Sequence, residues 1–326
     1  MTISISHGVR KERMKNKIFK SITLLILALS LSACAKNTRD IKEATTAEIT
    51  VTTPQGEKIT IPKDVSRVVS LSPAVTQVID ELGQKKKLIA VDSQSPKYVK
   101  GLDKLDQTDI MSLDLEKILA LKPELLFVTD LTMFQSSDAI KKIQEKGTEV
   151  IVLPSEKSLA EIESNIKLVA TSLDQKASGE KIVSQMEKEI ADIKKQAKSI
   201  TNRRSVLFQI AASPEIYSMG KETFINEMIE DIGATNVMAK ETGSIKVSEE
   251  AAIMSNPDVI LTNVNYIPHP VDDILQMKSW AEVKAVKNKD VYAIDNERSS
   301  LPNHHVVQAM KEMAKVVYPD VFKNIK

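Results

Sequence analysis

Two glutamates occupy matching positions in two segments of similar outline, "TDIMSLDLEKILALKPELLFV" and "KVSEEAAIMSNPDVILTNV". In both segments the glutamate, Glu116 or Glu250, is followed seven positions later by a proline, and then by an acidic residue and an apolar run. Each glutamate lies at the start of a predicted helix, where the helix dipole favours a carboxylate and where Ser112 or Ser248 is expected to cap the helix. An exposed carboxylate can also bind a basic partner, so the repeat leaves both roles open.

Soft and nitrogen-bearing metal ligands are few in this chain. Met111 offers a thioether, which can coordinate haem iron but can also fill an irregular apolar gap. Beyond residue 33 the histidines all lie in the last fifth of the chain. His269, between two prolines, is a candidate ligand or an exposed loop residue, whereas His304 and His305 are expected to be solvated or to cap the last helix. Because transition-metal sites usually take histidine and carboxylate ligands, we do not expect capture of free zinc or manganese.

The charged residues are unevenly distributed along the 326-residue chain, whose formal net charge is +1. Residues 1–33 hold six basic residues and one acidic residue, so the remainder has a net charge of −4. A mildly acidic chain without a basic patch is not expected to bind nucleic acid. The length is sufficient for two domains of ordinary size.

The positive charge at the start belongs to a predicted signal peptide, residues 1–33, in which Met14 begins a more typical signal than Met1 does. Its apolar run, "ITLLILALSLSA", is too short to span a membrane but suits a signal-peptide core. The following "LSAC" resembles the lipobox of bacterial lipoproteins, and Cys34 is the only cysteine in the chain. Lipid attached to Cys34 would anchor the protein at the extracytoplasmic face of the cell membrane, and the polar residues 34–50 are predicted to form a flexible tether.

Signatures of enzyme chemistry are absent from the sequence. It contains no G-x-S-x-G, no H-E-x-x-H, no phosphate-cradling G-x-x-x-x-G-K-[ST] and no dinucleotide fingerprint. With only 9 glycines, phosphate-binding loops are not expected. We therefore predict a protein that is not an enzyme, and an extracytoplasmic enzyme is the alternative from a different class.

Short apolar strands alternate with helices beyond the tether. "RVVSLSP", "LIAVD", "ELLFVTD" and "EVIVLP" predict strands within residues 51–175, and the pattern restarts at "SVLFQIA" within residues 201–326. This alternation predicts parallel sheets covered on both faces. Residues 176–200 have an apolar stripe at helical spacing and a charged opposite face, which predicts a helix that links two lobes. The predicted fold is therefore α/β, a monomer of two Rossmann-like lobes with central parallel sheets joined by one long rigid helix.

The loops after the strands are the expected place for a ligand, because open parallel sheets bind ligands beyond the carboxyl ends of their strands. Two lobes that face each other would line one cleft with these loops. The predicted ligand-binding residues are Ser72, Tyr98, Met111, Met133, Tyr266, His269 and Arg298.

Five segments together resemble the class III substrate-binding proteins of ABC importers, the receptors for ferric siderophores, haem and cobalamin. They are "RVVSLSPAVTQVIDELG", "MSLDLEKILALKPELLFV", "IYSMGKETFINEMIEDIGATNVM", "VSEEAAIMSNPDVILTN" and "WAEVKAVKNKDVYAID". The resemblance covers about residues 60–322. It implies a receptor without a cofactor of its own that delivers its ligand to a permease dimer with its ATPase. It also implies that Glu116 and Glu250 contact arginines of the two-subunit permease.

The resemblance extends to the choice of ligand. Met111 lies where the haem receptors of Gram-positive bacteria place an axial methionine. Their axial histidine corresponds to Asn265 here, and His269 in the same loop can take its place, so that each lobe would supply one ligand to the iron. Arg298 and Tyr266 could instead bind a carboxylate or hydroxamate oxygen of a siderophore. We expect an iron complex, with haem preferred over a ferric siderophore and cobalamin third.

Overall fold

The computed structural model describes residues 47–325, so the predicted signal peptide, Cys34 and most of the predicted tether lie outside the described residues. The chain from Ala47 onward forms one compact unit. It begins with an antiparallel hairpin of β1 (Glu48–Thr52) and β2 (Lys58–Pro62), whose first strand starts inside the range predicted as tether. Within the described part of the chain, no helix is long and apolar enough to cross a membrane.

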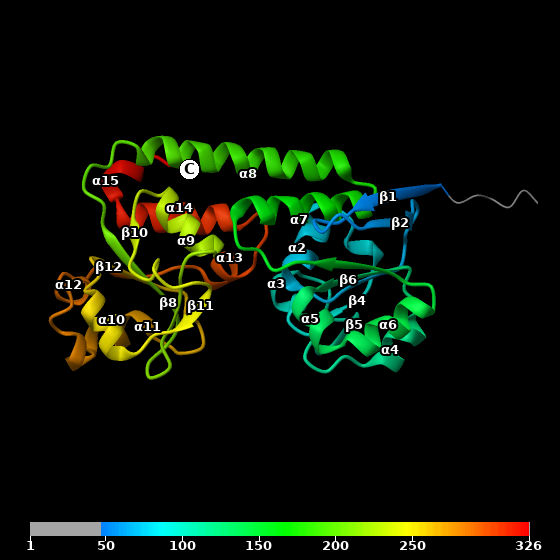
Figure 1. Ribbon diagram of the computed structural model, residues 1–326, viewed down its shortest axis with the longest axis horizontal. Helices are drawn as coiled ribbons and strands as arrows, with labels where there is room; N and C mark the ends of the chain where they lie inside the picture. Colours follow the sequence, from blue (N-terminus) through cyan, green and yellow to red (C-terminus); the bar gives the residue numbers. More distant parts are fainter. Residues whose placement is uncertain (1–46, 326) are drawn as a thin grey trace, which may run out of the picture. The chain divides into compact units, whose positions relative to one another are not determined.

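The N-terminal lobe is built on a five-stranded sheet with the order β5-β4-β3-β6-β7, in which every neighbouring pair is parallel. Its apolar strands alternate their side chains between two cores, one under α2 and one under α4 and α6. Figure 1 shows these helices on opposite faces of the sheet. The elements are β3 (Val68–Ser70), α2 (Pro73–Glu81), a 3-10 turn (Lys85–Lys87), β4 (Leu88–Asp92), α3 (Ser95–Tyr98), β5 (Asp106–Thr108), α4 (Leu115–Leu121), β6 (Leu125–Thr129), α5 (Asp130–Gln135), α6 (Ser137–Glu145) and β7 (Glu149–Leu153).

The C-terminal lobe has a sheet of order β11-β9-β8-β12-β13, with β10 also paired to β8. Helices α9 and α14 cover one face, and α10, α11 and α12 pack with Trp280 on the other. The elements are β8 (Ser205–Ala211), β9 (Tyr217–Met219), α9 (Phe224–Asp231), β10 (Thr235–Asn236), β11 (Ser244–Lys246), α10 (Glu249–Ser255), β12 (Val259–Thr262), α11 (Pro270–Gln276), a 3-10 turn (Lys278–Trp280), α12 (Lys284–Lys287), β13 (Val291–Ala293), α13 (Asn296–Ser300), α14 (Val306–Val317) and α15 (Pro319–Phe322).

Not every strand of the second sheet is parallel as predicted. β9 runs antiparallel to β8, and β11 runs antiparallel to β9. The segment between β8 and β9, residues 212–216, is too short for the crossover that a parallel connection needs, so the chain must turn straight back. The core strands β8, β12 and β13 are parallel, which keeps the strand-end loops at one edge.

Two long helices connect the lobes: α7 (Leu159–Ser172) and α8 (Lys176–Ala197). Figure 1 shows α8 running along both lobes, with α7 beneath one half of it and α14 beneath the other. The helices α7 and α8 approach closely at Gly179, where an added Cβ would clash with the Cβ of Ala170. The α/β architecture of two sheets and a long linking helix is therefore confirmed.

Side chains also join the two lobes directly. Gln77 on α2 donates through Nε2 to Glu297 on α13, and its Oε1 accepts from Asn303 Nδ2 at 2.6 Å. At the first residue of α7, the Leu159 N–H donates to Glu227 Oε2 on α9 at 2.8 Å. Both Gln77 and Asn303 are buried, so these bonds are shielded from water and resist separation of the lobes.

Candidate functional site

The strand-end loops of the N-terminal lobe are fixed by a buried polar network. Ser95 Oγ donates its proton to Asp92, and the hydroxyl oxygens of Ser95 and Thr76, like those of Thr76 and Ser70, lie 2.9 Å apart in one hydrogen-bonded chain. Asp92 Oδ1 also accepts the Ser95 N–H at 2.9 Å, which holds the start of α3. The loops after β3 and β4 therefore present a rigid wall rather than an adaptable one.

Two predicted ligand residues lie on this wall. Ser72 is buried, and its hydroxyl caps α2 by accepting from the Val75 N–H at 3.5 Å. Tyr98 is half-buried at the end of α3, where burial, followed by the charges of Glu297 and Asp92, raises the pKa of its hydroxyl. The raised pKa keeps the Tyr98 hydroxyl protonated, so that it can donate a hydrogen bond.

Met111 is the most accessible of the predicted ligand residues in this lobe. It occupies a tight turn after β5, where its N–H donates to Asp109 Oδ1 at 2.9 Å, and its side chain is 63% exposed. The predicted residue Met133, in contrast, is partly buried against the lobe core. Its neighbours Leu131 and Phe134 on α5 are exposed instead, Phe134 to 84%.

Leu131 and Phe134 are therefore site candidates that sequence reasoning missed. Helix α5 starts directly after β6, with Thr129 as its cap, so both side chains lie at the carboxyl edge of the sheet. Their spacing of three residues, which places them on one face of a helix, is the signal that could have identified them.

The C-terminal lobe places three predicted ligand residues in the loops after β12 and β13. Tyr266 is exposed, and its hydroxyl accepts from the Ala212 N–H at 2.7 Å. The side chain of His269 is 75% exposed at the start of α11, with Nδ1 4.0 Å from Asp272 Oδ2. Arg298 is exposed on α13, and only its backbone N–H is engaged among the described contacts, with Asp295 Oδ1 at 2.9 Å.

A pocket of about 400 Å³ lies beside these loops, within the C-terminal lobe. It is bounded by the ends of β8 and β12, by Tyr266 and Ile267, and by α11. Its one deeply buried amide is Gln209, which belongs to β8. The pocket sits at the edge of the sheet where ligands of this fold type bind.

His304 does not have the predicted solvated or capping role, whereas His305 is the N-cap residue of α14 but forms no capping hydrogen bond through its side chain. The side chain of His304 is only 13% exposed, and neither ring nitrogen finds a hydrogen-bond partner among the described residues. Burial, followed by the neighbouring His305 ring at 3.9 Å between centroids, lowers the pKa of His304 to about 4. The pair lines a separate pocket of about 520 Å³ with Glu81 of α2 and residues of α8.

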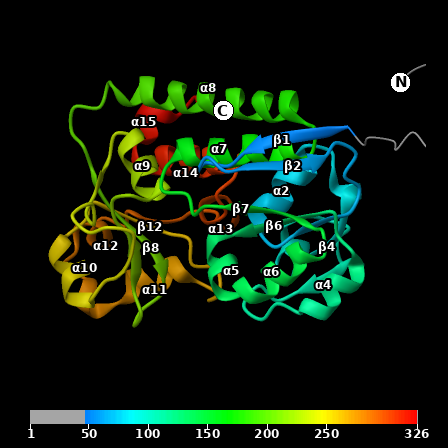
Figure 2. The ribbon, with the colours of Figure 1, turned by 45° about the vertical axis from the view of Figure 1, so that its right-hand side comes forward.

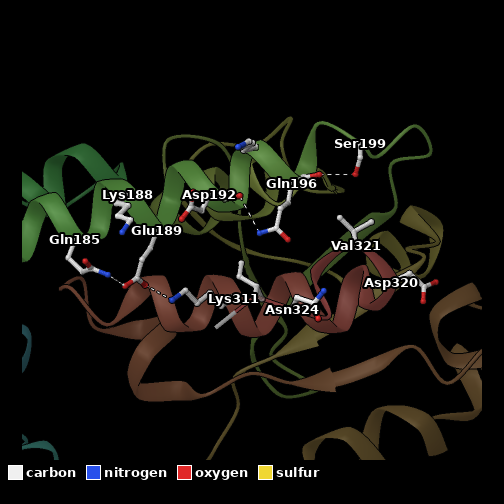
Figure 3. A pocket seen from close by; sticks show the side chains of 12 residues that line it. Gln185, Lys188, Glu189, Asp192, Gln196, Ser199, Lys311, Asp320, Val321 and Asn324 are labelled. Atoms are coloured by element: carbon white, nitrogen blue, oxygen red, sulfur yellow. Dashed lines mark hydrogen bonds and ion pairs between the residues drawn. The ribbon is translucent and has the colours of Figure 1, made fainter.

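A further pocket of about 1010 Å³ lies between α8, α14 and α15, away from the strand ends. Figure 3 shows that Gln185, Glu189 and Lys311 point toward one another across it. Glu189 accepts from both Gln185 Nε2 and Lys311 Nζ, which neutralises the charge at this point. None of the predicted ligand residues lines this polar groove.

The two predicted docking glutamates occupy equivalent places. Glu116 and Glu250 are both exposed and both lie in the first turn of a seven-residue helix, α4 or α10. The cap of α10 is Ser248, as expected, but the cap of α4 is Asp114 and not Ser112. Asp114 is two residues closer to the helix, where its carboxylate accepts the Lys117 N–H at 3.0 Å.

Glu249, the residue before Glu250 in α10, forms hydrogen bonds within the C-terminal lobe. Glu249 Oε1 accepts from Trp280 Nε1 at 3.2 Å and from the Ser279 hydroxyl. These bonds tie α10 to the lobe. The side chain of Glu250 is exposed and forms none of the described side-chain hydrogen bonds or ion pairs.

Each of these two helices ends in the same way. Lys122 (φ 46°) and Asn256 (φ 42°) both adopt the left-handed conformation, and a proline follows each. The repeated outline in the sequence therefore corresponds to a repeated structure.

Within residues 47–325, no group of three or more histidine, cysteine, aspartate or glutamate side chains could hold a metal ion. The candidate site is accordingly a set of exposed apolar, imidazole and guanidinium groups on two rigid lobes. Such a surface offers apolar contacts and polar groups that could orient a ligand.

Comparisons with known proteins agree with this geometry. A model of the periplasmic binding protein family matches residues 68–298. The uncharacterized ABC transporter substrate-binding lipoprotein YvrC of Bacillus subtilis is 29% identical over 318 residues, which cover 95% of this chain and 100% of that protein. The molybdate-binding protein MolA of Haemophilus influenzae is 26% identical, with 94% of this chain and 92% of that protein covered.

Solved structures share the fold. MolA bound to molybdate superposes with a TM-score of 0.73 at 23% identity, over 85% of this chain and 94% of that one. The periplasmic heme-binding protein RhuT of Roseiflexus sp. RS-1, in apo form, gives a TM-score of 0.67 at 24% identity, over 79% and 99% of the two chains.

Proposed function

Because the chain belongs to the periplasmic binding protein family, as a class III substrate-binding protein of an ABC importer, we propose that its cargo is a metal tetrapyrrole, with haem preferred. One observation carries the proposal. The strand-end loops of the two lobes expose four large apolar side chains to solvent: Met111, Leu131, Phe134 and Tyr266. Exposed apolar side chains after the strands of both lobes favour a large, flat, apolar ligand.

A small oxyanion such as the molybdate of MolA would need a different lining. A compact anion is held by converging N–H groups and cations, and it gains nothing from exposed aromatic or thioether groups. Here Arg298 is the one cation among the seven predicted ligand residues. The apolar side chains therefore favour a macrocycle over a bare oxyanion.

Haem is the first candidate because the loops offer a possible axial pair. Met111 and His269 come from different lobes, both follow parallel strands, and both are more than half exposed. A thioether and an imidazole form an established pair of haem ligands. A ferric siderophore is the second candidate, because the exposed guanidinium of Arg298 can bind its oxygen atoms.

Delivery of the ligand follows from the outer surface of the lobes. Glu116 and Glu250 dock onto basic residues of the permease dimer, and lipid on Cys34 holds the receptor at the extracytoplasmic face of the membrane. Exposed ion pairs contribute only about 0.2–1 kcal/mol each, so the paired glutamates act mainly on orientation and encounter rate.

The test is a haemin titration followed by the Soret band. Met111→Ala and His269→Ala should each shift the band and weaken haem retention, and the double variant should lose most of it. Met254→Ala is the matched control, because Met254 is also solvent-exposed, at 84% against 63% for Met111, but lies on α10, away from the strand ends. If haemin gives no saturable change while a ferric hydroxamate quenches Trp280 fluorescence, the siderophore is the ligand.

A further inference from the structure

The side-chain amide of Gln77 joins the two lobes through both of its polar atoms. Gln77 is buried on α2 of the N-terminal lobe; its Nε2 donates to the Glu297 carboxylate, and its Oε1 accepts from Asn303 Nδ2 at 2.6 Å. Both partners belong to the C-terminal lobe, in the segment between β13 and α14. We call these three residues the interlobe clasp. Figure 2 shows α13, the helix that carries Glu297, beside α2.

The orientation of each amide in the interlobe clasp is fixed by its partners. An ionised carboxylate only accepts hydrogen bonds, so Gln77 must turn its Nε2 toward Glu297. Asn303 is oriented in turn, because its Oδ1 accepts the His305 N–H at 2.8 Å and its Nδ2 is left to donate to Gln77. Both amides are buried, so water does not readily replace these bonds, and rotation of either amide would break two of them.

In the C-terminal lobe the interlobe clasp is continuous with a predicted ligand residue. Glu297 and Arg298 are neighbours on α13, a helix of five residues. Asn263, which follows β12, donates through Nδ2 to the hydroxyls of Ser299 and Ser300 at 3.0 Å each. These bonds hold α13 to the sheet as one piece, so the place of Glu297 also fixes the place of Arg298.

In the N-terminal lobe the interlobe clasp is continuous with the wall of the strand-end loops. Gln77 directly follows Thr76, whose hydroxyl belongs to the buried polar network with Ser95 at the start of α3. Tyr98 lies at the end of the same helix, and burial, followed by the charge of Glu297, raises its pKa. Glu297 therefore lies near both α2 and α3, the two helices of this wall.

Two further polar contacts between the lobes lie near the start of α7 and do not involve the ligand site. The Leu159 N–H donates to Glu227, and Lys157 Nζ is 3.9 Å from Glu222 Oε2 in an ion pair whose side chains are both more than half exposed. Exposed ion pairs contribute little. These contacts hold α7 against the C-terminal lobe, but no predicted ligand residue lies on the elements that they join.

We propose that Gln77 is a positioning residue of the ligand site, and that the interlobe clasp sets the spacing between the wall of α2 and α3 and the helix that carries Arg298. The proposal rests on the proposed function in one respect: Tyr98 and Arg298 contact the transported ligand. A ligand that meets both walls at the correct spacing does not lose binding free energy in bringing them together. Loss of the interlobe clasp therefore weakens binding in proportion to the fraction of molecules that lose the spacing.

The test exchanges the two functional groups of the interlobe clasp. Gln77→Glu places a second carboxylate against Glu297, and the two repel each other. Adding Glu297→Gln restores the pair, because the introduced amide donates to the introduced carboxylate while Asn303 donates as before. Glu297→Gln alone keeps an acceptor for Gln77 and should have little effect. Rescue by the second substitution separates positioning from a general loss of stability.

The spacing is measured by double electron–electron resonance between spin labels on the two lobes. Lys141→Cys on α6 and Ala251→Cys on α10 place labels at exposed positions, and a Cys34→Ala background leaves them as the only thiols. The full-length chain is measured in detergent at pH 8, without ligand. We expect a narrow distance distribution for the intact interlobe clasp and for the double variant, and a distribution about twice as wide for Gln77→Glu.

Haemin binding is followed by the Soret band in the same variants. Gln77→Glu should weaken it about tenfold, and the double variant should return to within about threefold of the unaltered protein. Gln276→Glu is the control, because Gln276 is exposed on α11 and forms none of the described side-chain hydrogen bonds. Unchanged spacing in Gln77→Glu, wider spacing with intact haemin affinity, or a double variant that restores neither property would overturn the proposal.

The ligand-free measurement separates this proposal from the proposed function. If Gln77→Glu widens the distribution and the double variant restores it, but haemin gives no saturable change with the unaltered protein, the interlobe clasp stands and the tetrapyrrole proposal fails. If haemin binds equally to the unaltered protein and to Gln77→Glu, and the spacing is the same in both, the receptor function stands and the positioning role of Gln77 fails.

Discussion

Replacing His304 with phenylalanine should remove much of the acid sensitivity of the fold. The imidazole is nearly buried where α2, α8 and α14 meet, it forms no hydrogen bond with the described residues, and its pKa is lowered to about 4. Phenylalanine keeps a flat ring at this place and cannot take up a proton. Because no hydrogen bond is lost, the substitution should be tolerated at neutral pH.

The direction of the effect follows from proton binding. The ordinary pKa of 6.5 applies to the unfolded chain, so between pH 6.5 and pH 4 the unfolded state holds a proton that the folded state excludes. Stability therefore falls as the pH falls through this window. Each pH unit costs about 1.4 kcal/mol, so the loss between pH 6.5 and pH 5 is about 2 kcal/mol.

Charged and titratable groups lie near the His304 ring on three elements. His305 lies against it on the same segment, Glu81 Oε2 on α2 is 3.8 Å from Nε2, and Lys181 and Glu189 reach the same pocket from α8. Burial, followed by the charge of His305, lowers the pKa of His304.

The assay is urea unfolding at pH 7 and pH 5, followed by fluorescence of Trp280, the single tryptophan, which is buried in the C-terminal lobe. The unaltered protein should lose about 2 kcal/mol more than His304→Phe over this range. His269→Phe is the control, because that side chain lies largely in solvent. Identical pH dependence in His304→Phe and the unaltered protein would refute the reasoning.

Three other predictions follow from the charges and the anchor. Glu156→Gln should raise stability at pH 8 by about 3 kcal/mol, because burial raises the pKa of Glu156 to about 7, so the folded state is destabilised by ionisation of this carboxyl as the pH rises from 4.5 through 7; unfolding at pH 5 and pH 8 checks it. The double variant Glu116→Gln and Glu250→Gln should keep ligand affinity but reduce uptake by cells, and normal uptake would leave the two carboxylates as dipole partners only. Cys34→Ala should release the protein from the membrane fraction, and a variant that stays membrane-bound would disprove lipid anchoring.

The architecture was predictable because its signals are local. Apolar runs such as "ELLFV" and helical stripes such as that of α8 appear in the sequence at the spacing that their own element requires. The antiparallel β9 was not predicted, because its direction depends on the length of one connection and not on its own residues. The cap at Asp114 was missed for a related reason, since serine and aspartate cap equally well and the true helix start decides between them.

The site was less predictable than the fold, because exposure and pairing are tertiary properties. Met133 and Phe134 are adjacent and similarly apolar, yet one packs on the core and the other faces solvent. Nothing near Gln209 in the sequence shows that one of its amide atoms is paired and the other is not. His304 follows a loop and precedes a helix, a position typical of exposed residues, and only the approach of α2 and α8 buries it.

The left-handed ends of α4 and α10 differ in how far they depend on residues from elsewhere in the chain. Asparagine tolerates this conformation well, and Asn256 also supports α12 by accepting the Lys284 N–H through its own Oδ1 at 2.9 Å. Lys122 lacks that ability, and its turn is clasped by Arg67, which donates to the Lys122 carbonyl at 3.2 Å from 55 positions earlier in the sequence. If α10 were moved into another protein, Asn256 would move with it and could still end the helix. If α4 were moved alone, Arg67 would stay behind, and the turn at Lys122 would lose that hydrogen bond.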